Sequence, residues 1–166
     1  MTDIQKQTAV LSEPQILTVP ARTLVGINAR YSCENRSGIP AQWSQFGPHI
    51  GHIPGQVNGM SYGVSHHQTS DGMFDYLCAV EVAGSQSPPA GFTALHLDSQ
   101  RVAVFRHRGP ADKIPAIVDA IFSEWLPSSN YLVHGEVNLI EQYSEDFNPV
   151  SGAGWVDLCV PVRSHA

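Results

Sequence analysis

The second half of the chain combines strand-like segments with one segment of helical hydrophobic spacing. Residues 101–108 (RVAVFRHR) are rich in β-branched and aromatic side chains, which predicts a strand. The apolar residues that follow recur at helical spacing and form one broad stripe, made of Ile114, Ile117, Val118, Ile121, Phe122 and Trp125. Two more strands are expected at residues 137–143 and 155–162, with turn residues between them. The pattern therefore predicts a βαββ unit.

The first half of the chain repeats this order of elements. Strands are expected at residues 23–31, 60–66 and 74–82. The tripeptide Ile-Pro-Ala opens the helical region of both halves, at residues 39–41 and 114–116, and apolar residues that follow it match at the same offset. This agreement in order and spacing favours a duplicated βαββ unit.

The chain is expected to be a single domain, residues 1–166, with its two units at residues 13–83 and 92–163. A stretch rich in proline, glycine and serine near residues 85–91 is typical of a linker. Strand-like segments at residues 15–19 and 92–97 are expected to extend the sheet edges. Because neither unit can bury an apolar face alone, we expect an α+β fold with one antiparallel sheet, two main helices and a cleft at the pseudo-two-fold seam.

Capping residues and prolines predict where the two helices begin and end. Ser37 and Asp112 each precede the helical proline by three residues. Each is a candidate N-cap, because its side-chain oxygen can accept from the free N–H groups of the first turn. Pro127 is expected to end the second helix, and Pro48 is expected to shorten or kink the first.

Composition and charge narrow the function classes. With 42% hydrophobic and 14% charged residues, the chain is typical of a globular protein and not of a disordered one. Nucleic-acid binding needs clustered basic residues, so the net charge of −6 argues against direct contact with DNA or RNA. No signal peptide is recognised, and no run approaches the roughly 18 apolar residues of a membrane span. We therefore expect a cytoplasmic protein with no membrane association.

No cofactor, metal or catalytic motif is expected. The three cysteines, Cys33, Cys78 and Cys159, have no CxxC spacing and suit a reducing compartment. The adjacent histidines His66 and His67 would point to opposite faces of a strand, which argues against a shared metal. No glycine-rich phosphate loop or nucleophile elbow occurs. Catalytic residues are therefore not assigned.

Glu141 is the principal candidate for ligand binding. Strand alternation places it on one face with Val137, Leu139 and Tyr143, so its carboxylate is expected among apolar neighbours. A buried carboxylate without a partner is costly, and burial raises its pKa. A cationic ligand would supply the missing charge. The alternatives are an internal salt bridge with an arginine or histidine, or an edge position open to water.

Aromatic side chains are the candidate walls of such a site. Tyr76 and Tyr143 are the strongest of them, because a buried phenol needs a polar partner. The other candidates are Trp43, Phe46, Tyr62, Phe105 and Trp155. Because most aromatic residues at such spacings belong to the core, about half of the set is expected to line the groove.

A series of short motifs is similar to those of one known family. In order, the motifs are Pro20-Ala21-Arg22-Thr23-Leu24, Ile39-Pro40-Ala41-x-Trp43, Phe74-x-Tyr76-x-x-Ala79-Val80-Glu81-Val82, Ala103-Val104-Phe105-x-His107-Arg108-Gly109, Ile114-Pro115, Ile121-Phe122-x-Glu124-Trp125-Leu126-Pro127, Glu141-x-Tyr143 and Val160-Pro161-Val162. Through them the chain resembles the GyrI-like family, the effector-binding domains found alone or at the C-terminus of AraC- and MerR-type regulators. The resemblance covers most of the chain from about residue 13 onward.

The resemblance implies two βαββ repeats and a cleft that binds amphipathic, frequently cationic small molecules beside a glutamate and aromatic side chains. The family's glutamate falls on Glu141. The segment before the first expected strand is too short for a helix-turn-helix domain, so the resemblance implies the freestanding form of the domain. Such a form would act alone or with a separate regulator or protein target.

Three function hypotheses follow from the sequence. The first is a non-enzymatic module that binds small amphipathic, cationic organic molecules. The second is a hydrolase of reactive small molecules with Glu141 as general acid or base, because a subset of the family looks like hydrolases. The third is antagonism of a protein such as a toxin or a topoisomerase.

Overall fold

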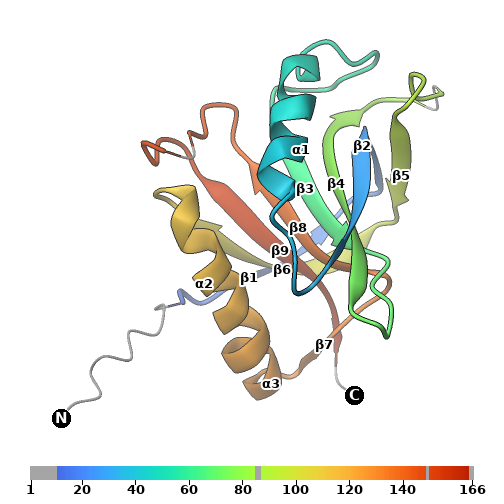
Figure 1. Ribbon diagram of the computed structural model, residues 1–166. Coiled ribbons are helices and arrows are strands. Elements are labelled where there is room, and N and C mark those ends of the chain that lie inside the picture. Colours follow the sequence, from blue (N-terminus) through green and yellow to red (C-terminus); the bar gives the residue numbers. More distant parts are fainter. Residues whose placement is uncertain (1–10, 85–86, 149, 165–166) are drawn as a thin grey trace.

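The computed structural model describes residues 11–84, 87–148 and 150–164. In these residues the backbone forms an antiparallel sheet with two helical segments in front of it (Figure 1). The strands are β1 (Gln15–Val19), β2 (Arg22–Ser32), β3 (Ser61–His66), β4 (Met73–Val82), β5 (Thr93–Leu97), β6 (Gln100–His107), β7 (Tyr131–Val133), β8 (Val137–Tyr143) and β9 (Val156–Ser164). The expected α+β class, one antiparallel sheet with two main helices, is confirmed.

The strands expected from the sequence all form, with ends that agree to within two residues. The short strand β7 was not expected. It has only three residues, all of them partly buried, so it shows no alternation that a pattern analysis could detect. It pairs with the end of β9, where Val133 lies opposite Val162. The expected linker falls partly on residues 85–86, which lie outside the described residues.

The first helix, α1 (Ile39–Phe46), is short, as Pro48 predicts. It ends at Phe46 and is followed by a single 3-10 turn over Gly47–His49. The expected N-cap at Ser37 is wrong, because α1 begins without a side-chain cap and the Ser37 hydroxyl donates to Asn35 Oδ1 at 2.9 Å.

The second helical segment ends close to the expected place. Helix α2 (Ile114–Ala120) continues through a π-helical turn (Ile121–Trp125) into α3 (Leu126–Ser128). Pro127 lies inside α3, and the helix ends at the next residue, Ser128. The proline removes one donor, and the Ser128 hydroxyl supplies another by donating to the Glu124 carbonyl at 2.6 Å. The expected N-cap at Asp112 is also wrong: Asp112 lies within a 3-10 turn that precedes α2, and no side chain caps either element.

The strand order is consistent with two related halves. The order is β1-β6-β9-β8-β3-β4-β2-β5, so the first half's β2, β4 and β3 mirror the second half's β6, β9 and β8 across the central β3–β8 pair. An arginine–aspartate ion pair joins the equivalent strands of each half, Arg30 with Asp75 and Arg106 with Asp157, each at 2.8 Å. The division into units at residues 13–83 and 92–163 stays a prediction.

The sheet is strongly curved, because short links join strands at its opposite edges. Only Pro20 and Ala21 separate β1 from β2, and only Asp98 and Ser99 separate β5 from β6. These links bring the two edges together on one side of the sheet. The enclosed face packs as one apolar cluster with residues from both edges and from the centre: Leu24, Tyr62, Val64, Leu77, Ala79, Leu97, Val102, Ile140 and Cys159.

The opposite face carries both helices and leaves a gap between them. Helix α1 covers one apolar cluster and α2 covers another. Between them, the central strand β3 presents only small side chains on this face, namely Ser61, Gly63 and Ser65. The sheet is therefore uncovered above β3 and β8, where the sequence analysis places the seam.

Candidate ligand-binding cleft

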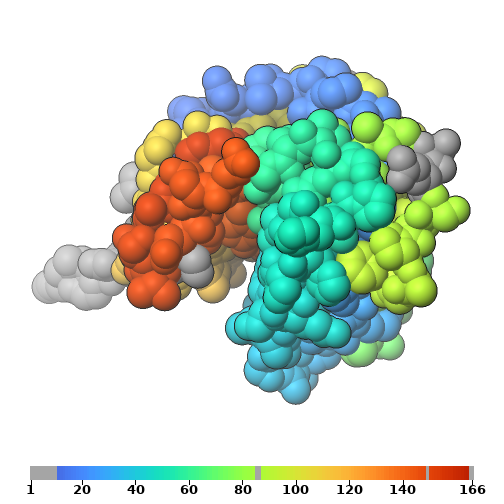
Figure 2. All heavy atoms as spheres, turned by 90° about the horizontal axis from the view of Figure 1, so that it is seen from above, coloured from blue at the N-terminus to red at the C-terminus, as the bar shows by residue number. Residues whose placement is uncertain are grey.

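A cleft of about 1210 Å³ lies between the two helical segments, above β3 and β8. Figure 2 shows the molecule hollowed between the orange segment near residues 140–155 and the cyan and teal segment that contains α1. The cleft draws its lining from both halves of the chain, with Trp43 on α1, Val118 on α2 and Glu141 on β8.

The floor of the cleft depends on a glycine. Gly63 on β3 lies opposite Glu141 on β8 and opposite Cys78 on β4. A Cβ atom at Gly63 would overlap the Tyr76 hydroxyl and the Glu141 carboxylate. Only glycine at this position therefore lets the phenol and the carboxylate meet across the strand.

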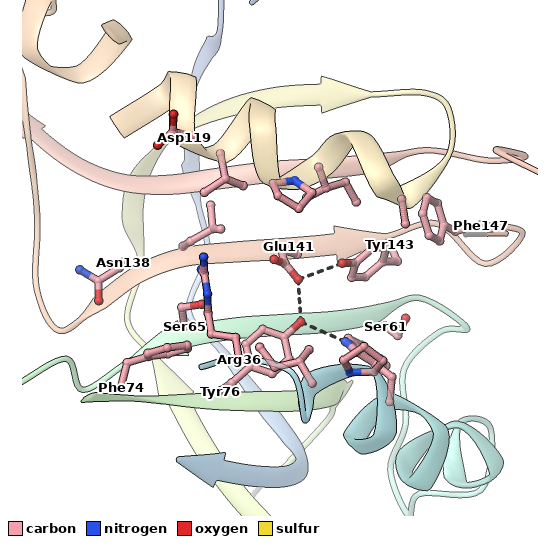
Figure 3. A pocket seen from close by; sticks show the side chains of 18 of the residues that line it. Arg36, Ser61, Ser65, Phe74, Tyr76, Asp119, Asn138, Glu141, Tyr143 and Phe147 are labelled. Carbon is pink, nitrogen blue, oxygen red and sulfur yellow. Dashed lines mark hydrogen bonds between the residues drawn. The ribbon is translucent and has the colours of Figure 1, made fainter. Parts of the chain in front are cut away.

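Glu141 is held at the floor by two phenols. The hydroxyls of Tyr76 and Tyr143 both donate to Glu141 Oε1, at 2.7 and 2.9 Å (Figure 3). The indole N–H of Trp43 donates to the Tyr76 oxygen at 3.0 Å, which orients that hydroxyl toward the carboxylate. Among the described residues, Glu141 Oε2 accepts no hydrogen bond.

The surroundings disfavour ionisation of these groups. Burial raises the pKa of Glu141, and the two tyrosine hydrogen bonds oppose that rise by stabilising the carboxylate. Burial, with the Glu141 charge nearby, raises the pKa of Tyr76 and of Tyr143 well above 10, so both phenols stay protonated and donate. The Glu141 side chain is nonetheless partly exposed into the cleft. The site is a carboxylate that retains an open oxygen and lacks a full counter-charge.

The internal salt bridge that the sequence analysis left open does not form. Within the described part of the chain, no arginine, lysine or histidine forms an ion pair with Glu141. Arg36 lines the same cleft and lowers the pKa of Glu141, but less than the two phenols do. The edge alternative also fails, because β8 is central in the sheet.

Aromatic rings wall the cleft beside Glu141. The rings of Trp43 and Tyr143 meet edge to face with centroids 5.5 Å apart. The ring centroids of Tyr143 and Phe147 are 4.9 Å apart. The facing wall comes from the second helical segment, through Val118 on α2 and Phe122 in the π-helical turn. The cleft therefore combines one carboxylate with apolar and aromatic surfaces on two sides.

The structure brings together four of the eight residues that the sequence analysis selected. Glu141, Tyr76, Tyr143 and Trp43 line the cleft and form one connected network.

The other four selected residues do not line the cleft. The Trp155 ring stacks with the Arg106 guanidinium, whose carbon lies 3.9 Å from the ring centroid. Phe46 is fully buried beneath α1 and packs against Trp43 and Phe92, with centroids 6.3 Å away in both cases. Phe105 is buried beneath the second helical segment, with its ring 5.1 Å from that of Trp125. Tyr62 points to the enclosed face of the sheet, because strand alternation directs it opposite to Gly63.

A β-bulge changes the face assigned to Val137. The pairing of β3 with β8 shifts between Ser65, which lies opposite Leu139, and His66, which lies opposite Val137. The extra residue, Asn138, lines the cleft, while Val137 packs against the cluster on the enclosed face. The expectation that Val137 shares the face of Glu141 is therefore wrong.

Sequence reasoning missed several lining residues. Asn138 is missed because simple alternation places it on the other face. Val118 and Phe122 were assigned to the helical core stripe, which is broad enough to reach both the sheet and the cleft. Arg36 lies in the segment between β2 and α1, where no periodic signal identifies a site.

The described residues contain no group of three or more histidine, cysteine, aspartate or glutamate side chains that could hold a metal ion. In the same part of the chain, no helix is long and apolar enough to cross a membrane.

The fold and the cleft define an α+β domain of the small-molecule-binding class. The chain belongs to the GyrI-like small molecule binding domain family, whose model matches residues 12–163. The expected family membership is confirmed.

Relatives place the same fold in different proteins. The transcriptional regulator BrlR of Pseudomonas aeruginosa is 29% identical over 150 residues, which are 89% of this chain and 54% of BrlR, so the chain spans about half the length of that relative. The structure of SAV2435 bound to tetraphenylphosphonium has a TM-score of 0.68 at 21% identity and covers 92% of this chain and 94% of SAV2435.

EcmrR supplies a further comparison. Its C-terminal domain has a TM-score of 0.67 at 13% identity, covering 92% of this chain and 98% of that domain. A structure of an EcmrR–DNA complex has a TM-score of 0.64 at 12% identity, and the match covers 96% of this chain and 60% of the EcmrR chain. The expectation that these 166 residues make no direct contact with nucleic acid therefore stays a prediction.

Proposed function

We propose that this domain binds small amphipathic organic cations reversibly in the cleft and does not convert them. The observation that carries the proposal is Glu141. Its carboxylate lies at the floor of an aromatic cleft, two phenols bind one of its oxygens, and no described cation pairs with it.

The network leaves a defined place for a cation. Tyr76 and Tyr143 fix Oε1, so the carboxylate cannot turn away from the cleft, and Oε2 keeps free acceptor capacity. A cation that lies against Oε2 offsets the burial that raises the pKa of Glu141. The electron-rich faces of neighbouring rings add cation–π attraction of about 0.5–2 kcal/mol.

The size and charge of the cleft favour a bulky, apolar organic cation. Ligand pockets commonly enclose roughly 300–1,000 Å³, so a cleft of about 1210 Å³ has room for several rings. Glu145 and Asp119 also line it, so the carboxylates outnumber the single guanidinium of Arg36. The tetraphenylphosphonium bound to SAV2435 is a ligand of the kind that this lining suits.

Isothermal titration calorimetry with tetraphenylphosphonium tests the proposal. Glu141→Gln keeps the size of the side chain and an oxygen acceptor for the phenols, and it removes the charge. Tetraphenylphosphonium has no hydrogen-bond donor, so its attraction to Glu141 is Coulombic. At an effective dielectric constant of about 20, opposite charges about 6 Å apart attract by roughly 3 kcal/mol before desolvation is subtracted. We therefore expect Kd to rise roughly 10-fold.

Glu136→Gln is the matched control. It makes the same chemical change at an exposed carboxylate that precedes β8 and does not line the cleft. We expect it to leave Kd unchanged. Equal affinity of the wild-type and Glu141→Gln proteins for the cation would overturn the proposal.

A further inference from the structure

The two ends of the cleft carry different side chains. Along β3, Ser61 lies opposite Tyr143, whereas Ser65 lies opposite Leu139, beside the bulged residue Asn138. Phe147 and Tyr143 wall one end, and Ser65 and Asn138, with the ring of Phe74 nearby, mark the other (Figure 3).

Arg36 belongs to the end marked by Ser65 and Asn138. Figure 3 shows its side chain extended over the floor beside Ser65, on the side of Glu141 where Asn138 lies. Its backbone is fixed, because the Arg36 carbonyl accepts from the Ile39 N–H at 3.2 Å in the turn before α1. Within the described residues, the Arg36 guanidinium has no hydrogen-bond or ion-pair partner, although Glu141 lies close enough for their charges to interact.

The neighbours of Arg36 are also donors without partners. The Ser65 hydroxyl and the Asn138 amide make no side-chain hydrogen bond to the described residues, and both line the cleft. Asn138 faces the cleft only because of the β-bulge, a device that re-aims side chains near binding sites. Asp119 also lines this end, but its carboxylate points away from the floor in Figure 3.

We propose that Arg36, Ser65 and Asn138 form a second subsite that binds a carboxylate or similar acceptor group of the ligand. This inference rests on the proposed function of Glu141. It narrows the ligand class to molecules that carry both a cationic centre and an acceptor group. The cation lies at Glu141 with its apolar groups toward Tyr143 and Phe147, and the acceptor meets the guanidinium, whose planar fork suits a carboxylate.

A pair of phosphonium ions tests the subsite. (4-Carboxybutyl)triphenylphosphonium and pentyltriphenylphosphonium share the cation and the arm, and only the first carries a carboxylate. Calorimetry gives Kd of both for wild type, for Arg36→Gln and for the control Arg163→Gln, which removes an exposed guanidinium outside the cleft. The homologue with a carboxypentyl arm tests whether the length of the arm limits contact between its carboxylate and Arg36.

We expect Arg36→Gln to weaken binding of the carboxylate ligand about fivefold to tenfold, as for an accessible charge-assisted contact. Binding of the pentyl ligand is expected to stay equal or to tighten slightly, because a like charge is removed. Arg163→Gln is expected to change neither.

The outcomes separate the two proposals. If pentyltriphenylphosphonium binds in a Glu141-dependent way and Arg36→Gln shifts all ligands by the same factor, the second subsite is refuted while the proposed function stands. If none of the phosphonium ions binds to wild type, both are refuted.

Discussion

Replacing Glu141 with glutamine should stabilise the ligand-free protein at neutral pH. Burial raises the pKa of Glu141 in the folded state above its unfolded value. The folded state therefore holds the Glu141 proton more tightly than the unfolded chain does. That stabilisation is fully present below the unfolded pKa, about 4.3, and is lost as pH rises through the folded pKa. At any pH above the unfolded pKa, folding must either bury the Glu141 charge or take up a proton, and both oppose folding. A glutamine carries no charge at any pH.

The size of the effect is set by the net difference in the Glu141 pKa between the folded and unfolded states. Burial raises that pKa, and the hydrogen bonds from Tyr76 and Tyr143 offset only part of the rise. Each unit of such a difference corresponds to about 1.4 kcal/mol. Each kcal/mol of added stability raises Tm by about 2–4 °C for a domain of this size, so we expect Glu141→Gln to raise Tm measurably.

Thermal unfolding of ligand-free wild type, Glu141→Gln and Glu136→Gln at neutral pH and near pH 4 measures the effect. Glu141→Gln should raise Tm only at neutral pH, and Glu136→Gln should have little effect at either pH. A Glu141→Gln protein that is equally destabilised at both pH values would show that the carboxylate serves packing, and the argument for an unsatisfied ligand-binding charge would fail. A substitution that stabilises the free protein while weakening ligand binding is the expected signature of a functional residue.

Three further predictions concern the same cleft. The affinity for tetraphenylphosphonium should fall as pH drops through the folded pKa of Glu141, starting at a higher pH than for an ordinary carboxyl group, and should be nearly independent of pH in Glu141→Gln; a pH series of titrations checks this. Gly63→Ala should destabilise the protein by about 1–3 kcal/mol through overpacking and weaken cation binding, because its methyl group overlaps Tyr76 and Glu141. Ser65→Ala on the same strand is the control and should leave the stability unchanged. A Gly63→Ala protein with wild-type stability and affinity would contradict the close contact of Tyr76 and Glu141 over Gly63. Activated esters and strained electrophiles should give no product on incubation with the protein by chromatography, whereas turnover that is lost in Glu141→Gln would favour the hydrolase alternative.

Much of the fold could be predicted because strands and helices leave periodic signals. Alternation along residues 137–143 placed Leu139, Glu141 and Tyr143 on one face correctly, and the structure keeps them there. The same rule failed at Val137, because a β-bulge inserts a residue without changing the composition of the strand. Pro127 marks the end of the second helical segment to within one residue, whereas the π-helical turn before it leaves no signal in the sequence pattern.

The site was harder to predict than the fold, because the walls of the cleft and the hydrophobic core are built from the same types of side chain. Phe46 and Phe105 are as apolar as Phe122, yet only Phe122 faces the cleft. What separates them is the spacing of two helices over a curved sheet, which depends on contacts between distant segments. The hydrogen bond between Tyr76 and Glu141 likewise joins residues 65 positions apart and passes over a glycine on a third segment.

A co-crystal structure with tetraphenylphosphonium tests the central claim most directly. We predict that the ligand lies in the cleft against Trp43 and Tyr143, with its phosphonium centre closer to Glu141 than to Glu145 or Asp119, and that both phenols still bind Glu141 Oε1. A ligand bound outside the cleft, or a Glu141 carboxylate paired with Arg36 while the cation lies elsewhere, would contradict it.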